Sequence, residues 1–529
     1  MSTTTANGAL KQRLPLLAIL LVFIVLKFPH LSYPFIWDES WPYASAINQM
    51  YERGPSLLPG VIDSELSRGH PLLLHFIVSS WMRVFGPSHM AMHSVMLLIA
   101  CLLLVGVYEA ANKIGGVKAA VITTVLIAFQ QIFFVQASFV MPEVLLALLA
   151  FLSIYFYTQR RYLLTTLFVT LLCFTKESGM VVGIVLGIDA LVSLFQKQVS
   201  VKDKLYKLGS LVLPAVAVGI FFVMQKQRCG WYMFPLHTEA ISFSVDEFST
   251  KFRDCMKVFF RDDMRKVWFA GVGILSLIVA IKNRYRRYGV MLALLVVCIL
   301  IATIDFAPPL RGIFLAGLAV LLPAVTNQWS REAGVGDKSL RKFLLLSACL
   351  VVAFSIFTAT NFFITRYLII ALVPLLFIAG LIYTDGLLKL NKHLFWPGLL
   401  LIVALQALSY YRANHIADVK ITAYDAMDVQ QDEVRFAEEA NYYDKWTTVF
   451  DNLQKLHLED PGSGFRSNNR PFNKLLWGVM DSTQIVILDN VESMRAVDSS
   501  KQYKQDPHYK LVHRYQKGMA WNEVYERSR

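Results

Sequence analysis

Long apolar runs recur through the first four-fifths of this 529-residue chain, and they constrain its fold more than any other feature. A helix needs about twenty apolar residues to cross a hydrocarbon core roughly 30 Å thick. Hydrophobic residues make up 55% of the chain and charged residues only 17%, below the quarter or so that is typical of soluble proteins. The sequence therefore predicts a mainly α, polytopic membrane helical bundle.

About thirteen segments, with an uncertainty of about two, are predicted to span the membrane. They are 14–28, 89–108, 117–136, 142–158, 162–175, 178–195, 208–224, 267–281, 288–306, 310–326, 343–362, 366–384 and 394–411. Two long polar loops interrupt them, at 29–88 and 225–266. Within the first loop, 71–85 is short and amphipathic, which predicts a helix lying in the membrane interface. No small-residue cleavage site follows Phe28, so an uncleaved first helix is favoured over a signal peptide.

The net charge of +13 indicates membrane topology and not a nucleic-acid partner, because the basic residues gather in alternate short turns between apolar runs. These cations are Lys113, Lys118, Arg160, Arg161, Lys197, Lys202, Lys204, Lys207, Lys282, Arg284, Arg286, Arg287, Arg331, Lys338, Arg341, Lys342, Lys389 and Lys392. The positive-inside rule then places the N-terminus in the cytoplasm. With an odd number of spans, 412–529 lies outside, and the chain is expected in the inner (cytoplasmic) membrane.

The last part of the chain changes character and predicts a small extracytoplasmic α/β domain over 412–529, following a membrane domain over 1–411. A helical pattern covers Asp432–Leu456, and a turn is expected at 460–464. Thr483–Leu488 has the composition of a buried strand, and two more strands are expected near Tyr509–Tyr515 and Trp521–Tyr525.

The six cysteines indicate no zinc-type spacing. Four of them lie in apolar runs, where cysteine usually serves packing. Only Cys229 and Cys255 fall in a polar loop, and whether they pair is open.

Ionisable residues beside the apolar segments collect on the predicted outer side. They are Asp38, Glu39, Glu143, Lys176, Glu177, Arg311 and Arg366, the last followed by Tyr367. Each has a structural alternative: Asp38 and Glu39 could be a solvated acidic loop beside Trp37 and Trp41, Glu143 a helix N-terminal acid, and Lys176 or Arg366 a snorkelling cation. Their shared sidedness favours a site, because snorkelling cations should prefer the inner side.

Acids beside cations at an outer membrane surface suit one chemistry in particular. Lysine and arginine can neutralise a lipid phosphate at this depth. A nearby carboxylate can take the proton of an attacking hydroxyl, a role worth roughly 10²–10⁴-fold in rate. The departing phosphate needs cations more than an acid. This combination predicts glycosyl transfer from a lipid-phosphate sugar.

At this point the chain resembles the C-type-fold (GT-C) membrane glycosyltransferases, and more specifically the superfamily of protein O-mannosyltransferases and aminoarabinose transferases. Five features carry the resemblance: the Asp38-Glu39 pair, Arg68-Gly69-His70-Pro71-Leu72, Glu143 where the family often has Asp, Thr175-Lys176-Glu177-Ser178-Gly179, and Arg366-Tyr367. The resemblance covers about residues 14–400 as architecture and is strong in motif only over about 14–180.

The resemblance implies roles for these residues. Asp38 is the candidate catalytic base with Glu39 beside it, Glu143 orients the acceptor or a metal, and Lys176 and Arg366 contact the phosphate. His70, Glu177, Arg311 and Tyr367 are counted among the residues that bind the lipid phosphate or sugar. Some relatives bind a divalent metal, for which Glu65, His70 and His237 are weak candidates beside a structural role for His70. Donors in the family are polyprenyl-phosphate monosaccharides, transferred with inversion.

Two functions from other classes remain open. A non-catalytic transporter or flippase of lipid-linked sugars would carry polar groups near the bilayer midplane and internal repeats, neither of which is clear in the sequence. A non-catalytic assembly subunit would not need Asp38. The sequence gives neither the sugar nor the acceptor (a lipid, a glycan or a protein), nor the metal dependence, the oligomeric state or the role of the C-terminal domain.

Overall fold

The computed structural model of the chain describes residues 3–32, 39–239, 241–242, 244–302, 308–361, 363–420, 465–467, 485–489, 507–517 and 520–528. Within these ranges the side chains of 3–11, 32, 40–41, 65, 236, 239, 301–302, 308–314, 412–420 and of most of the four strands lie outside the description. The predicted helix 432–456 and the turn at 460–464 also lie outside the described residues.

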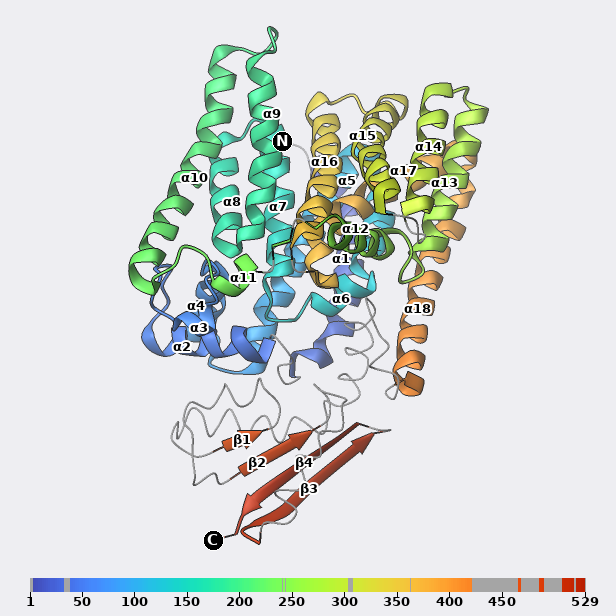
Figure 1. The fold of residues 1–529 in the computed structure, drawn as a ribbon. Coiled ribbons are helices and arrows are strands. Elements are labelled where there is room, and N and C mark those ends of the chain that lie inside the picture. The colour runs from blue at the N-terminus through green and yellow to red at the C-terminus, as the bar shows by residue number, and fades with distance from the viewer. Residues whose placement is uncertain are drawn as a thin grey trace.

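Helices dominate the described residues (Figure 1). They are α1 (Thr3–Lys27), α2 (Ser45–Arg53), α3 (Ser64–Ser67), α4 (Leu73–Phe85), α5 (His89–Ala128), α6 (Gln131–Gln136), α7 (Pro142–Thr158), α8 (Tyr162–Thr175), α9 (Met180–Leu194), α10 (Val201–Cys229), α11 (Pro235–Glu239), α12 (Val245–Phe260), α13 (Arg265–Lys282), α14 (Arg286–Ala302), α15 (Pro308–Glu332), α16 (Lys338–Thr360), α17 (Ile369–Leu390) and α18 (Phe395–Lys420). Shorter 3₁₀ and π turns join them: η1 (Phe28–Ser32), η3 (Ser40–Ala44), η4 (Glu177–Gly179), η5 (Thr365–Leu368) and η6 (Lys392–Leu394).

Each of the thirteen predicted spans overlaps a helix in the part of the chain that the structure describes. The two spans 89–108 and 117–136 correspond to α5, which is broken at Gly116 (φ 75°, ψ −179°), followed by α6. By length and composition, seven helices in the described part of the chain can cross a membrane, or eight if the bent pair α12–α13 is one span. Three more apolar helices, α4, α7 and α8, are shorter. The chain is a mainly α, multi-pass membrane protein, and the number of thirteen crossings stays a prediction.

Helix α17 forms the centre of the bundle. In the span that contains it, 94% of the most apolar window is buried, against 28% for α1, α10 and the span of α18, which leaves those three at the lipid-facing periphery. Close packing of α17 on α5 depends on a small residue, because a Cβ added at Gly380 would lie 2.8 Å from Oγ1 of Thr123. Small residues at helix contacts let membrane helices approach in this way.

The first polar loop folds into short helices at one end of the bundle, where α2, α3, α4 and α11 lie together (Figure 1). The predicted amphipathic helix is confirmed as α4, whose Leu74, Val78 and Met82 are buried on one face. At the opposite end lie the turns with the basic residues, such as the α9–α10 turn.

The C-terminal residues contribute a four-stranded sheet in the order β1-β2-β4-β3, formed by β1 (Phe465–Ser467), β2 (Ile485–Asp489), β3 (Tyr509–Lys517) and β4 (Ala520–Arg527). Strands β1 and β2 are parallel, and the other pairs are antiparallel. All three predicted strands are therefore confirmed, and β1 was not predicted. The predicted domain boundary at 411/412 falls inside α18, which continues to Lys420.

Candidate active site

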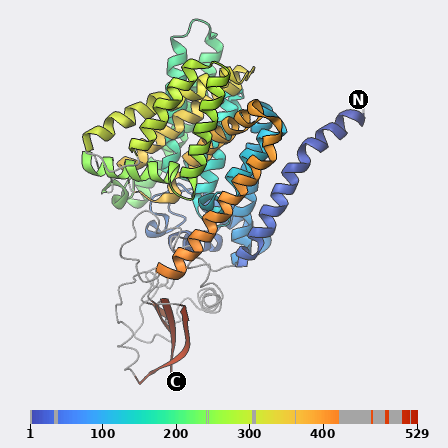
Figure 2. The same cartoon turned by 90° about the vertical axis from the view of Figure 1, so that its right-hand side faces the viewer.

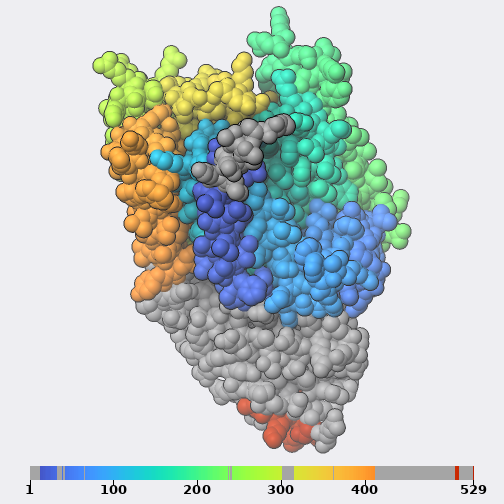
Figure 3. All heavy atoms as spheres, turned by 180° about the vertical axis from the view of Figure 1, so that it is seen from behind, coloured from blue at the N-terminus to red at the C-terminus, as the bar shows by residue number. Residues whose placement is uncertain are grey.

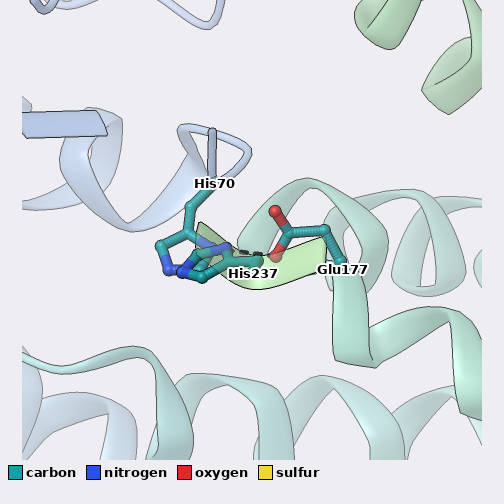
Figure 4. Close-up of side chains that lie close together, drawn as sticks. All are labelled: His70, Glu177 and His237. Atoms are coloured by element: carbon teal, nitrogen blue, oxygen red, sulfur yellow. Dashed lines mark hydrogen bonds and ion pairs between the residues drawn. The ribbon is translucent and has the colours of Figure 1, made fainter. Parts of the chain in front are cut away.

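Three side chains from distant parts of the chain meet at the loop end of the bundle. They are His70 from the turn before α4, Glu177 from η4 and His237 from α11 (Figure 4). Their nearest ligand atoms all lie within 4.8 Å of one another. His70 Nδ1 and Glu177 Oε2 are 2.8 Å apart, and the two imidazole rings stack with centroids 4.8 Å apart. Two imidazoles and one carboxylate therefore converge on one small volume.

The turn that carries His70 is held by close backbone packing. Arg68 and Gly69 both have positive φ, 45° and 72°, a conformation that glycine adopts without steric cost. A Cβ at Gly69 would lie 2.7 Å from the Trp231 ring and 3.1 Å from the backbone nitrogen of Phe234. The second polar loop thus packs directly on this turn, which brings His237 to His70.

A second cluster surrounds Glu143 at the start of α7. Its Oε1 lies 3.5 Å from Lys176 Nζ and 3.8 Å from Arg366 Nε. The ammonium of Lys176 also sits 3.8 Å above the ring of Tyr367. Glu143, Lys176 and Arg366 are 3%, 8% and 9% exposed, so the three charges are largely withdrawn from water. Two cations against one carboxylate leave an excess of one positive charge.

The two clusters adjoin, because Lys176 and Glu177 are consecutive residues in the α8–α9 turn and extend to different partners. Burial opposes the charged form of Lys176, but Tyr367 and Glu143 outweigh it and raise the pKa of that lysine, which is therefore charged at neutral pH. Burial, together with nearby His70, lowers the pKa of His237 to about 4. His237 is thus a neutral imidazole at neutral pH, the form that binds metals.

Glu39 is fully buried and contacts both a histidine and the protein backbone. Oε1 accepts a 2.8 Å hydrogen bond from the backbone N–H of Val140 and lies 2.8 Å from Nε2 of His93. Nδ1 of His93 in turn lies 3.0 Å from the carbonyl oxygen of Leu31, which fixes the ring at both nitrogens. These contacts tie the first loop to α5 and to the segment before α7, and they favour a positioning role for Glu39 beside Asp38.

The remaining predicted site residues are only partly placed. Asp38 lies outside the described residues, as do the side chains of Glu65 and Arg311. The role of Asp38 as a base therefore stays a prediction.

The two cysteines whose pairing was left open are both free thiols. Cys229 lies at the end of α10, and Cys255 is buried in α12.

Sequence reasoning grouped Glu65 with His70 and His237, and this stays a prediction because the side chain of Glu65 lies outside the described residues. The structure brings Glu177 to the two histidines. Glu177 follows Lys176 in the chain, and the sequence analysis assigned it to the lipid phosphate or sugar. Sequence reasoning also missed His93 as the partner of Glu39. The one signal for His93 was a histidine at the start of an apolar helix, and such a histidine more often packs in a core than serves a site.

A divalent metal fits the cluster of His70, Glu177 and His237. Two imidazole nitrogens and a carboxylate oxygen are the donor set of catalytic zinc sites, which keep a further position open. His237 is neutral at neutral pH, and the Glu177 oxygen already faces His70. The same geometry also suits a simple hydrogen bond between His70 and Glu177.

Comparison with solved structures identifies the fold. The chain superposes on ArnT from Cupriavidus metallidurans bound to undecaprenyl phosphate with a TM-score of 0.54, 13% identity and coverage of 99% of this chain and 98% of that chain. Apo ArnT gives a TM-score of 0.50 with 12% identity and 98% coverage of both chains. The chain has the GT-C fold. At this identity the likeness shows the fold alone.

Sequence comparison adds little to the GT-C assignment. No family model matches the chain. An uncharacterized protein of Aquifex aeolicus (strain VF5) is 27% identical over 146 residues, which is 27% of this chain and 29% of that protein. The match thus spans less than a third of either protein.

Proposed function

We propose that this GT-C protein is an integral-membrane glycosyltransferase. It moves a monosaccharide from a polyprenyl-phosphate donor to a hydroxyl of a lipid, glycan or protein acceptor at the outer face of the cytoplasmic membrane, with inversion at the anomeric centre. The observation that carries the proposal is the buried Glu143–Lys176–Arg366 cluster beside the two histidines. The fold it shares with ArnT, which was solved with undecaprenyl phosphate, supports it.

The cation cluster suits a phosphate leaving group. A phosphate oxygen that enters beside Glu143 finds two cations that are already buried and oriented, so little rearrangement is needed as charge develops on the leaving oxygen. Arginine offers paired N–H groups to a phosphate, whereas lysine acts as a point charge. The ring of Tyr367 lies 3.8 Å from the Lys176 ammonium and attracts it by a cation–π interaction. Before the substrate binds, the Glu143 carboxylate compensates part of the positive charge of the buried Lys176 and Arg366.

Inverting transfer needs a base on the acceptor side. Asp38 is the proposed base: it takes the proton of the acceptor hydroxyl as the oxygen attacks the anomeric carbon and the bond to the phosphate oxygen breaks. Glu39, its neighbour in the chain, is fixed by His93 and Val140 and so anchors this end of the loop. Such positioning is what converts a nearby carboxylate into an effective base.

The histidine cluster is the proposed holder of a divalent cation. His70, Glu177 and His237 would bind it, and a bound cation would supply positive charge beside the phosphate or the acceptor. The chain's own residues already neutralise a phosphate through Lys176 and Arg366. We therefore expect the metal to assist binding and orientation.

Binding of undecaprenyl phosphate, the expected product lipid, tests the cation cluster. Protein purified in a neutral detergent is titrated with this lipid and followed by thermophoresis. Lys176→Gln and Arg366→Gln should each weaken binding by about tenfold or more, the value of a hydrogen bond to a charged group. Lys226→Gln is the matched control, because Lys226 is exposed in the last turn of α10, where its ammonium donates to the carbonyl oxygen of Gly230 and lies over the ring of Tyr232.

Equal affinity of wild type and the three variants for undecaprenyl phosphate would show that the phosphate does not bind at Lys176 and Arg366. The proposal would then lose the observation that supports it. A flippase of lipid-linked sugars would also bind the lipid. Sugar transfer by the purified protein separates the two, since a flippase performs none.

A further inference from the structure

A cavity of about 460 Å³ lies far from the candidate active site, between α1, α5 and α7. Its apolar wall is formed by Leu16, Val105, Ala110, Phe151, Leu152 and Phe156. The volume falls within the roughly 300–1,000 Å³ that is typical of small-molecule sites. The cavity therefore has room for a hydrocarbon chain.

Two features of the helices create this space. Helix α1 leaves the bundle towards its N-terminus, as Figure 2 shows, and runs along the back face in Figure 3. Opposite it, α5 carries Gly106, where an added Cβ would meet only the ring of Phe151 at 3.7 Å. A glycine at this point leaves the floor of the cavity open, so a larger residue there would fill it.

Polar residues gather at the rim. Arg13 Nε pairs with Glu109 Oε1 at 3.0 Å, and its side chain is 63% exposed. Lys113 is also exposed and donates a 2.7 Å hydrogen bond to the hydroxyl of Tyr155, a neutral partner that leaves its charge uncompensated. The rim thus has two cations and one carboxylate, and one positive charge remains.

The rim lies at the end of the bundle where α1 begins and where α5 turns at Gly116. This is the end of the basic turns, which the positive-inside rule assigns to the cytoplasm. Acidic phospholipids concentrate in the cytoplasmic leaflet and attract lysine and arginine near the surface. Both the positive charge of the rim and its position at the basic end of the bundle favour an acidic lipid as the ligand of this cavity.

We propose that this cavity binds an acidic phospholipid of the inner leaflet, with one acyl chain between α1, α5 and α7 and the head-group phosphate at Arg13 and Lys113. The assignment of the leaflet rests on the proposed topology, but the site is independent of the transferase activity. A lipid held here would fill the wedge between α1 and the bundle, and α1 leads into the loop that contains Asp38. Bound lipid would therefore steady the helix that precedes the first outer loop.

Native mass spectrometry tests the proposal on delipidated full-length protein, with phosphatidylglycerol and phosphatidylcholine of identical acyl chains as probes. Wild type should retain phosphatidylglycerol in preference to phosphatidylcholine. Lys113→Gln should lower phosphatidylglycerol affinity by about fivefold, the value of one cation at the lipid surface. Gly106→Leu should exclude both lipids. Lys282→Gln, at an exposed lysine of the same end on α13, is the matched control and should change nothing.

Glu109→Gln keeps the test independent of misfolding. Because it removes the one rim carboxylate, it should tighten phosphatidylglycerol binding by about fivefold, a gain that a damaged protein would not show. Equal retention of the two lipids by wild type, or no change in any rim variant, would overturn the acidic-lipid site. Retention of both lipids by Gly106→Leu would show that the acyl chain does not occupy this cavity.

Discussion

The buried and half-buried histidines of this chain have different partners and therefore different roles. His70 and His237 converge on Glu177, His93 holds Glu39, and His75 in α4 is 2% exposed with no hydrogen-bond partner at either ring nitrogen among the described residues. The ring of His75 stacks on Tyr43 at a centroid distance of 5.8 Å. Residue type alone does not separate a ligand from a packing residue, and only the partners do so.

The metal site makes a prediction for His237. Replacing it with alanine removes one of three ligands and should lower the affinity for Zn²⁺ by about a hundredfold or more, since even outer partners of metal ligands are worth 10–100-fold. Metal content after dialysis, measured by plasma mass spectrometry, checks this. His393→Ala is the control because His393 is exposed at the opposite end of the bundle. A wild type that retains no divalent metal would instead favour the plain His70–Glu177 hydrogen bond.

His75 makes a prediction about acid stability. Burial, with a smaller effect of His70, lowers the pKa of His75 to about 3. Between its unfolded pKa near 6.5 and this folded value, the unfolded chain binds the extra proton, so stability falls as the pH is lowered through that range. His75→Phe keeps the aromatic contact with Tyr43 and removes the titrating group. We expect the free energy of unfolding at pH 7 to rise by about 1–3 kcal/mol because the desolvation cost of the buried imidazole is removed. The Tm should therefore be higher at pH 7 and fall less at pH 5.

The measurement is thermal unfolding in detergent at pH 7.5 and pH 5, beside His393→Gln as an exposed control. An unchanged slope of Tm with pH in His75→Phe would mean that another group carries the acid sensitivity.

At the scale of elements, the site depends on how two polar loops pack on each other. The turn at Gly69 supplies both a positive φ and a close contact with Trp231, whereas Gly86 has a positive φ (87°) and nothing within 4 Å. Substitutions at the two glycines can therefore distinguish the effect of backbone strain from the effect of packing against the second loop.

Gly69→Ala should disturb the site more than Gly86→Ala. Both substitutions strain the backbone, by roughly 1–2 kcal/mol, but only the first displaces Trp231 and with it the segment that carries His237. We expect Gly69→Ala to lose bound metal and lipid-phosphate affinity while Gly86→Ala keeps them at a similar Tm. Equal effects of both variants would show that the second loop does not need this contact.

The sequence predicts the helices of this chain better than it predicts the contacts between its loops. Apolar runs are long and local, so they predicted the apolar helices of the bundle, but they gave no sign of α12, which lies in the segment interpreted as the second polar loop. The meeting of His70 and Glu177 depends on residues 107 positions apart, and no local pattern records which loop will cover which. Glu177, which the α8–α9 turn positions, was therefore assigned to the lipid phosphate or sugar and not to the two histidines. The contact of Gly69 with Trp231 has no local signal either, because these two residues are even further apart in the chain.

At the scale of the whole molecule, the account requires that the loop end and the basic end face opposite sides of the membrane. The cations of the α9–α10 turn lie at one end and the first polar loop lies at the other (Figure 1). Single cysteines in a cysteine-free variant test this with a membrane-impermeant maleimide in intact cells. Leu58→Cys, at a 57% exposed position of the first loop, should react, and Lys197→Cys should react only after permeabilisation. The reverse pattern would invert the topology and place the candidate site in the cytoplasm.

The most direct measurement is sugar transfer by the purified protein. The donors are a panel of polyprenyl-phosphate monosaccharides, and the acceptors are cell-envelope extracts that contain lipids, glycans and proteins with free hydroxyl groups. Release of polyprenyl phosphate is the readout common to all donors. We predict turnover by wild type, an inverted anomeric configuration in the product, and loss of turnover in folded Asp38→Asn with undecaprenyl-phosphate binding retained. Turnover in wild type and Asp38→Asn alike would move the base elsewhere. Binding of the lipid-linked sugar without turnover by any donor would contradict the transferase and favour a flippase.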